Sequence, residues 1–227
     1  MTRIGWGNMK KRGGKSIQTR SNGDQTREKI MAAAEKLFGQ QSFDAVSLRD
    51  ITNEAEVTLA LASYHFGTKE NLFTEVVARR ANVLNSIRRE RLAALVDRGG
   101  MTVETLLETF IRPLFEQMQS EDDGWQAYLM LLAKLSSNER WLDHLRTNFD
   151  ETANLYLGQL KLLLPHVPEE NLVRGFSFVL ILMVQTVSKN RRVDTLSSGK
   201  FKGEDLDVTY QLLLKFSLAG LRALETA

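Results

Sequence analysis

The chain has 227 residues, 43% of them hydrophobic and 26% charged, which is ordinary for a soluble globular protein of one large or two small domains. It contains no cysteine, which excludes disulfides, thiol catalysis and Cys-ligated metals and suits a reducing compartment such as the cytoplasm. The net charge is only +2, and the longest strongly apolar run, Phe176 to Val184, is far shorter than the roughly 20 residues that span a bilayer. We therefore expect no membrane contact.

Residues 1–23 are basic and rich in glycine, and they contain no acidic residue. Their positive charges are Arg3, Lys10, Lys11, Arg12, Lys15 and Arg20. Because this segment lacks apolar periodicity, we expect a disordered tail. Two interpretations stay open: a solvated tail without a role, and an arm that contacts nucleic-acid phosphates or enters a minor groove.

A first helix is predicted in TREKIMAAAEKLFG, where apolar residues recur at helical spacing on one face. Thr26 is its expected N-cap and Gly39 marks its expected end. A short second helix is predicted in VSLRDITNEA. There Ser47 is the expected N-cap, and Asp50 supplies the acidic partner of a capping box.

A third helix is predicted in LALASYHF, after a tight turn at residues 55–57, with Thr58 as N-cap and Gly67 as its end. A fourth, long helix is predicted from Thr68 to the Gly-Gly pair at 99–100. Its later part is rich in arginine, and we expect most of these side chains on a solvated face. This part carries Arg79, Arg80, Arg88, Arg89 and Arg91.

Further helices are predicted at about 102–119, 124–135, 139–164, 169–190 and 204–225, and Pro113 is expected to end or kink the first of them. No strand-like alternation persists anywhere in the sequence, so the predicted fold is all-α with about nine helices. The predicted domains are the basic tail (1–23), a helix-turn-helix unit (24–70) and a C-terminal ligand-binding and dimerisation bundle (71–227).

Two short helices joined by a three-residue turn and preceded by a packing helix form a helix-turn-helix arrangement, which reads DNA in the major groove. The expected groove-facing residues are uncharged: Thr58, Leu59, Leu61, Ala62, Ser63 and Tyr64. Ala and Leu suit thymine methyls, while Ser and Thr, including Ser47, suit phosphates or bases. Arg49 is the best candidate for a bidentate contact to guanine.

The Tyr64-His65 pair lies at the end of the third helix, where the chain leaves the groove beside the DNA backbone. Both side chains are expected to donate hydrogen bonds to phosphate oxygens, and Lys69 is expected to add a charge there. The free N–H groups at the start of the fourth helix add a partial positive field. The alternative for His65 is packing within the small domain.

Residues 26–73 resemble the TetR/AcrR family of transcriptional regulators, over about a fifth of the chain. The matching residues are Ile30, Ala33, Ala34, Leu37, Phe38, Phe43, Ser47, Arg49, Ile51, Ala55, Val57, Thr58, Tyr64, His65, Phe66, Gly67, Lys69, Glu70 and Leu72. The family usually has glycine in the turn where this chain has Glu56, which costs about 1 kcal/mol if the position needs a positive φ. The departure at Ala62-Ser63 predicts an unusual DNA target.

The resemblance implies a homodimer that binds a palindromic operator, represses nearby genes and pairs its last two helices with those of its partner. The segments 169–190 and 204–225 are independently apolar enough to need a partner, although an ordinary intramolecular core is the alternative. The resemblance also implies a cavity for a small hydrophobic effector. Its expected lining residues are Phe110, Phe115, Trp125, Tyr128, Trp141, His144, Phe149 and Phe176, with no charged clamp.

The expected mechanism is release from DNA when the effector shifts the spacing of the two reading helices through the fourth helix. An enzyme is not expected, because His65, His144 and His166 are scattered and no nucleophile–base pair or metal-ligand cluster is apparent; no metal or cofactor is predicted. A regulator that responds to a protein partner, or acts without a ligand, stays open, as does activation in place of repression.

Overall fold

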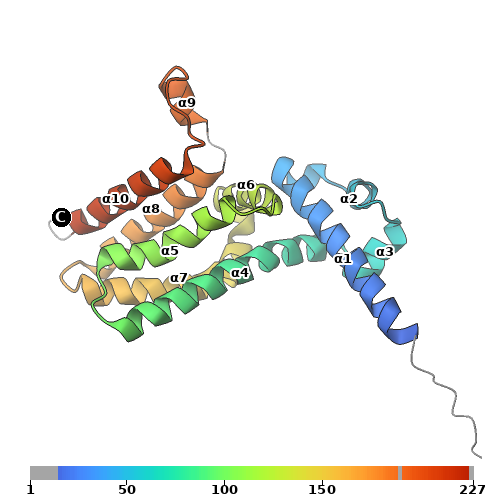
Figure 1. The fold of residues 1–227 in the computed structure, drawn as a ribbon, viewed down its shortest axis with the longest axis horizontal. Coiled ribbons are helices and arrows are strands. Elements are labelled where there is room, and N and C mark those ends of the chain that lie inside the picture. The colour runs from blue at the N-terminus through green and yellow to red at the C-terminus, as the bar shows by residue number, and fades with distance from the viewer. Residues whose placement is uncertain (1–14, 189–190, 225–227) are drawn as a thin grey trace, which may run out of the picture.

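The structure is a computed structural model that describes residues 15–188 and 191–224, and these residues form helices and connecting turns without any strand. The elements are α1 (Lys15–Gln40), η1 (Phe43–Ala45), α2 (Leu48–Glu54), α3 (Leu59–Phe66), α4 (Lys69–Arg98), α5 (Val103–Met118), α6 (Gly124–Ser136), η2 (Glu139–Trp141), α7 (Leu142–Leu163), α8 (Glu169–Val187), α9 (Arg192–Leu196) and α10 (Leu206–Ala223). The all-α prediction is confirmed. Helices α1 to α3 form one end of the molecule, the bundle forms the other, and α4 runs between them (Figure 1).

Helix α1 begins earlier than the sequence predicted. It starts at Lys15, so the prediction of an N-cap at Thr26 is wrong, and the Thr26 hydroxyl instead donates to the Asn22 carbonyl at 2.9 Å inside the helix. Lys15 to Gly23 are helical where a disordered tail was predicted, because no proline stops the helix and one internal glycine costs only about 1 kcal/mol. Residues 1–14 of the predicted tail lie outside the described residues.

The predicted boundaries of the short helices are confirmed. At the start of α2 the Ser47 hydroxyl accepts from the Asp50 N–H at 3.1 Å, and the Asp50 carboxylate accepts from the Ser47 N–H at 2.8 Å. Helix α3 ends at Gly67, whose φ of 73° lies in the left-handed region, and the Thr68 hydroxyl accepts from the Asn71 N–H at 3.1 Å. These local contacts satisfy backbone groups that the helix ends leave free.

Pro113 does not end a helix, because α5 continues through it from Val103 to Met118. Proline removes the N–H that would bond to the carbonyl four residues earlier. The next carbonyl, that of Phe110, accepts a hydrogen bond at 3.0 Å from Nε of Arg88 on α4. A side chain from a neighbouring helix therefore supports the backbone beside the proline.

The described hydrophobic residues form two cores that share α4 and α6. The first half of α4 packs with α1 to α3, and its second half packs in the bundle. From α6, Leu131 and Leu135 belong to the N-terminal core, whereas Leu129 and Leu132 belong to the bundle core. The predicted domain boundary at residue 70 therefore falls at the start of a helix whose first turns belong to the N-terminal core.

Helix α6 holds the end of α1 through backbone contacts. Gly39 lies in the last turn of α1, one residue before its end, and a methyl group there would stand 2.8 Å from Cα of Ala127 on α6. About two turns later, Lys134 donates from Nζ to the carbonyls of Phe38, Gly39 and Gln41 at 3.2, 2.6 and 3.0 Å. These are carbonyls that the C-terminus of a helix leaves unpaired. The lysine therefore caps α1 from another element.

A buried ion-pair network joins the same elements. Arg80 of α4 donates to Glu35 of α1 from Nε at 2.8 Å and from Nη2 at 2.7 Å, and it also pairs with Asp122, just before α6. Burial opposes the charge on Arg80, but the hydrogen bonds and charges of Glu35 and Asp122 outweigh it and raise the pKa of Arg80. This network and the Gly39 contact fix the N-terminal unit to the bundle.

Candidate DNA-reading surface and bundle cavity

The turn between α2 and α3 places residue 56 at a positive φ, the condition under which a non-glycine residue is strained there. Glu56 has a φ of 54°, so the non-glycine residue stands in the left-handed region, at a cost of about 1 kcal/mol. The turn is closed by the N–H of Val57, which donates to the Thr52 carbonyl at 3.0 Å. The helix-turn-helix geometry is therefore retained despite the missing glycine.

Helix α3 turns one face into the N-terminal core and the other to solvent. Ala62 is only 1% exposed and Phe66 is also buried, so the prediction that Ala62 faces DNA is wrong. On the opposite face Leu59, Ala60, Ser63 and Tyr64 are exposed, and Leu61 is 38% exposed at its edge. The sequence prediction missed Ala60, although positions 59, 60, 63 and 64 follow the 3.6-residue period and exclude 62.

Two of the predicted contact residues at the ends of α3 have free polar groups. Tyr64 is 82% exposed and stacks edge-on with the half-buried His65 at 5.2 Å between ring centroids. At the other end Thr58 occupies the N-cap position, but its side chain makes no capping hydrogen bond, so its hydroxyl is available to a partner.

Arg49 of α2 is exposed, and no ion pair or side-chain hydrogen bond engages its guanidinium within the described part of the chain. It is therefore able to reach a base or a phosphate. The Ser47 hydroxyl, in contrast, is occupied: it donates to Asp50 Oδ2 at 2.6 Å in the capping box. These hydrogen bonds from Ser47 lower the pKa of Asp50.

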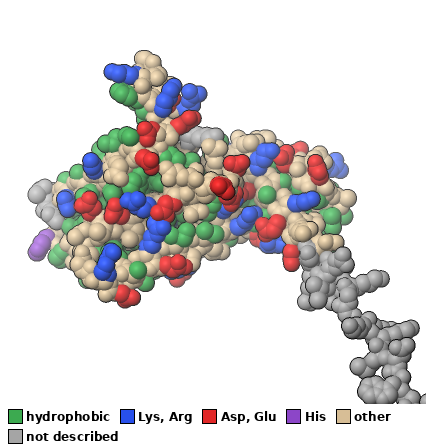
Figure 2. Space-filling view, viewed as in Figure 1, with side chains coloured by type: hydrophobic (Ala, Val, Ile, Leu, Met, Phe, Trp, Pro, Cys, Tyr) green, Lys and Arg blue, Asp and Glu red, His purple; other side chains and the backbone are tan. Residues whose placement is uncertain are grey.

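Lys69 does not point toward the expected phosphate position. Its Nζ donates to the carbonyls of Phe43 and Val46, both at 2.9 Å, and lies 4.1 Å from the centroid of the Phe43 ring. The ammonium group holds η1 against α4, and the contribution of its charge to DNA binding stays a prediction. On the face shown in Figure 2, basic and acidic side chains are mixed over the molecule.

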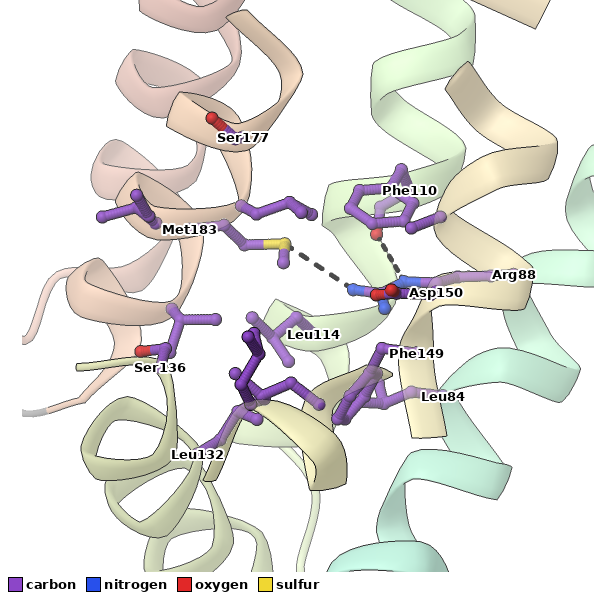
Figure 3. A pocket seen from close by; sticks show the side chains of 16 residues that line it. Leu84, Arg88, Phe110, Leu114, Leu132, Ser136, Phe149, Asp150, Ser177 and Met183 are labelled. Carbon is purple, nitrogen blue, oxygen red and sulfur yellow. Dashed lines mark hydrogen bonds between the residues drawn. The ribbon is translucent and has the colours of Figure 1, made fainter. Parts of the chain in front are cut away.

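The bundle contains a cavity of about 330 Å³ between α4, α5, α6, α7 and α8 (Figure 3). Twelve of its sixteen lining residues are apolar, and the polar ones are Arg88, Ser136, Asp150 and Ser177. A volume near 300 Å³ lies at the lower end of the range for small-molecule pockets, about 300–1,000 Å³. Among the described residues no cluster of three or more His, Asp or Glu side chains could hold a metal ion.

Of the eight predicted lining residues, Phe110 and Phe149 line this cavity and six do not. Phe176 packs behind the wall, with its ring centroid 5.2 Å from that of Phe110. Three others pack elsewhere in the structure, Phe115 against Tyr210 and Trp125 against Tyr128. Trp141 and His144 extend to the N-terminal core instead, at 4.8 and 5.4 Å from the Phe73 ring. Burial lowers the pKa of His144.

The expectation of a cavity without a charged clamp is wrong, because Arg88 lies in its wall. Arg88 is only 3% exposed; it donates from Nε to the Phe110 carbonyl at 3.0 Å and approaches the Met183 sulfur from Nη2 at 3.6 Å (Figure 3). Its guanidinium carbon lies 4.0 Å from the Phe110 ring centroid. Burial lowers the pKa of Arg88 to about 10, so it is still charged at neutral pH. Its spacing of four residues from Leu84 and from Leu92 was the available signal that it faces the core.

Comparison with known proteins agrees with this arrangement. Residues 30–76 match the family model described as bacterial regulatory proteins, tetR family, and residues 108–220 match the tetracyclin repressor-like C-terminal domain. The chain is 27% identical over 113 residues to the HTH-type transcriptional regulator BetI of Agrobacterium fabrum, and 26% identical over 137 residues to the HTH-type transcriptional repressor KstR2 of Rhodococcus jostii. These matches cover 50% and 60% of this chain, and 52% and 63% of the relatives, less than two thirds of either.

The fold also matches a solved structure, that of a transcriptional regulator from Aquifex aeolicus VF5. The TM-score is 0.58 at 18% sequence identity, and the match covers 86% of this chain and 98% of that one. Both parts of the chain, the helix-turn-helix unit and the bundle, therefore correspond to one known architecture. The chain belongs to the TetR family of transcriptional regulators, which are DNA-binding proteins and not enzymes.

Proposed function

We propose that this protein is a homodimeric repressor in the cytoplasm that binds a palindromic operator and leaves it when a small hydrophobic ligand occupies the bundle cavity. The outward face of α3 (Leu59, Ala60, Ser63 and Tyr64), with Thr58 and Arg49, enters the major groove. Each protomer reads half of a two-fold symmetric site, so the two reading helices stand one turn of B-DNA apart, about 34–36 Å.

The dimer is supported by exposed apolar side chains on two helices that pack side by side, α8 and α10 (Figure 1). These residues are Val173, Phe178 and Ile181 on α8 and Val208, Leu212 and Phe216 on α10. By length and composition α8 is apolar enough to cross a membrane, with 39% of its most apolar window buried. Its exposed apolar residues continue onto α10, an amphipathic helix, and a joint apolar patch of this kind suits a self-complementary protein interface.

The proposal that a ligand controls DNA binding rests on α6, which both lines the cavity and holds α1. Leu132 and Ser136 line the cavity, and on the same helix Ala127 and Lys134 hold the end of α1 by backbone contacts. A ligand that displaces α6 must therefore displace α1 and the reading helix that packs on it. A coupling free energy of about 1–3 kcal/mol, typical of allosteric proteins, weakens DNA binding about 5- to 150-fold.

The experiment is a gel-shift and footprint with purified protein on the DNA that flanks its own gene, using wild type, Arg49→Ala and Tyr64→Ala. We expect protection of a palindrome by wild type and loss of about 1–3 kcal/mol of binding free energy for Arg49→Ala if it contacts a base. Arg146→Ala is the charge-matched control, because Arg146 is exposed on α7 and pairs only with Asp143 in the described structure. Equal weakening by all three variants would contradict the assigned reading surface.

A further inference from the structure

The Arg88 guanidinium is a buried charge without a counter-charge among the described residues. It forms no ion pair with any described carboxylate, and burial lowers its pKa. Its hydrogen bonds go to a carbonyl and a thioether, both neutral. A buried charge is costly unless a partner of opposite sign accompanies it, so proteins retain one where it has a function.

The position of Arg88 is also unlike that of the other arginines of α4. Arg79, Arg80 and Arg91 each pair with a carboxylate, and Arg89 and Arg98 are exposed, with Arg89 donating to the Thr152 hydroxyl at 3.2 Å. Arg88 instead lines the cavity, among Leu84, Phe110, Leu114 and Met183 (Figure 3). The cavity thus combines a largely apolar wall with one cation that has donors to spare.

We propose that the cavity binds an amphipathic organic anion, whose carboxylate pairs with Arg88 while its apolar body fills the space between α5, α7 and α8. This inference rests on the proposed ligand-binding function and narrows its ligand to a class. A guanidinium presents its donors in a planar fork that matches a carboxylate, and the low dielectric of the cavity strengthens the pair.

The open side of the cavity explains where the apolar body lies. Leu142 of α7 is 59% exposed while lining the same cavity, so this side faces solvent, and Arg88 lies at the buried side. Asp150, exposed on α7, is the one carboxylate in the lining. It repels a second negative charge on the ligand, which favours a monoanion over a polyanion. Asp150 would also compete with a ligand carboxylate for Arg88, because a rotation of its side chain would bring an internal counter-charge into the cavity.

The test measures binding without DNA, by isothermal titration calorimetry of the full chain with decanoate, phenylpropanoate and the neutral decanol. Variants are Arg88→Met, which removes the charge but keeps an apolar stem, Arg88→Lys, Asp150→Asn and the control Arg89→Met on the exposed side of α4. Thermal unfolding of each variant establishes that it is folded. We expect at least one carboxylate to bind wild type, and Arg88→Met to weaken it about ten- to hundredfold.

The other variants and decanol distinguish binding through Arg88 from binding by apolar contacts alone. We expect Arg88→Lys to recover part of the affinity, Asp150→Asn to raise it, Arg89→Met to leave it unchanged, and decanol to bind wild type and Arg88→Met equally. The inference is overturned if neither carboxylate binds, if Arg88→Met binds carboxylates as wild type does, or if Asp150→Asn lowers their affinity. If Arg88→Met does not fold, the lysine and asparagine variants decide.

A gel-shift with the same probes keeps this inference distinct from the proposed function. Carboxylate binding through Arg88 that leaves the operator complex intact would support the ligand class and contradict release by ligand. Release by decanol alone, in wild type and in Arg88→Met, would support ligand release and overturn the ligand class.

Discussion

Replacing Gly39 with alanine tests whether α6 holds α1 as closely as the structure indicates. The added methyl would stand 2.8 Å from both Cα and C of Ala127, well inside the contact distance of about 3.5–4.0 Å between carbon atoms. The neighbour is backbone within α6, so it cannot rotate away as a side chain would. The two helices must instead move apart, and the hydrogen bonds of Lys134 to the end of α1 must lengthen.

Two opposing effects determine how much Gly39→Ala changes the free energy of unfolding. Alanine in place of glycine inside a helix stabilises the folded state by about 1 kcal/mol. Overpacking costs typically 1–3 kcal/mol, and a rigid neighbour places this site in the upper part of that range. We therefore expect Gly39→Ala to lower the free energy of unfolding by about 1–2 kcal/mol. For a chain of this length that lowers Tm by about 2–8 °C.

Gly158→Ala is the matched control, because Gly158 is also inside a helix, α7, but a methyl group there would have no atom within 4 Å. It should raise stability by up to about 1 kcal/mol. Both variants are measured by thermal and urea unfolding at one protein concentration, because the proposed dimer would make Tm concentration-dependent. If Gly39→Ala proves as stable as Gly158→Ala, the close contact between α1 and α6 is refuted.

Two further predictions concern the turn and the ion-pair network. Glu56→Gly should raise the free energy of unfolding by about 1 kcal/mol, because Glu56 has a φ of 54°. Urea unfolding measures this change. The control Glu54→Gly, inside α2, should lower the free energy of unfolding. Arg80 lowers the pKa of Asp122, so Asp122 stabilises the fold above the ordinary aspartate value of 3.8, and this contribution is lost as pH falls below that value through the folded-state pKa. Asp122→Asn should therefore show a shallower loss of stability in acid than wild type, whereas Asp123→Asn, which removes a neighbouring carboxylate that is unpaired in the described structure, should keep the wild-type slope.

Features that depend on local chemistry were predictable from the sequence. The capping box at Ser47, the left-handed glycine at Gly67 and the cap at Thr68 involve residues within four positions of one another, and all three are confirmed. The positive φ at Glu56 was only conditional in the sequence, where the family's usual glycine suggested it, and the structure shows it. These contacts form between neighbours in the chain and need no knowledge of tertiary structure.

The errors arise where a distant element decides the role of a residue. The sequence did not indicate that Phe43 and Val46, more than twenty positions from Lys69, supply carbonyls to its ammonium group. Gly39 was predicted at the end of α1, where it lies, but its close contact with Ala127 of α6 was not predicted. The lining of the cavity was also only partly predictable. Composition identifies the aromatic residues, but it does not show which of them border a cavity and which fill the core.

Arg88 combines both cases. Its helical spacing could be read from the sequence, but its position in a cavity wall could not. A spacing of four from Leu84 and from Leu92 assigns it to the buried face of α4, whereas its charge argues for the solvated face. The structure resolves this conflict by placing it against an interior cavity, beside the α5 carbonyl next to Pro113. A sequence that violates its own pattern at one position often does so at a functional site. Because α4 also carries Arg80 and the start of the N-terminal core, a ligand held by Arg88 would contact a second helix, besides α6, that joins the cavity to the N-terminal unit.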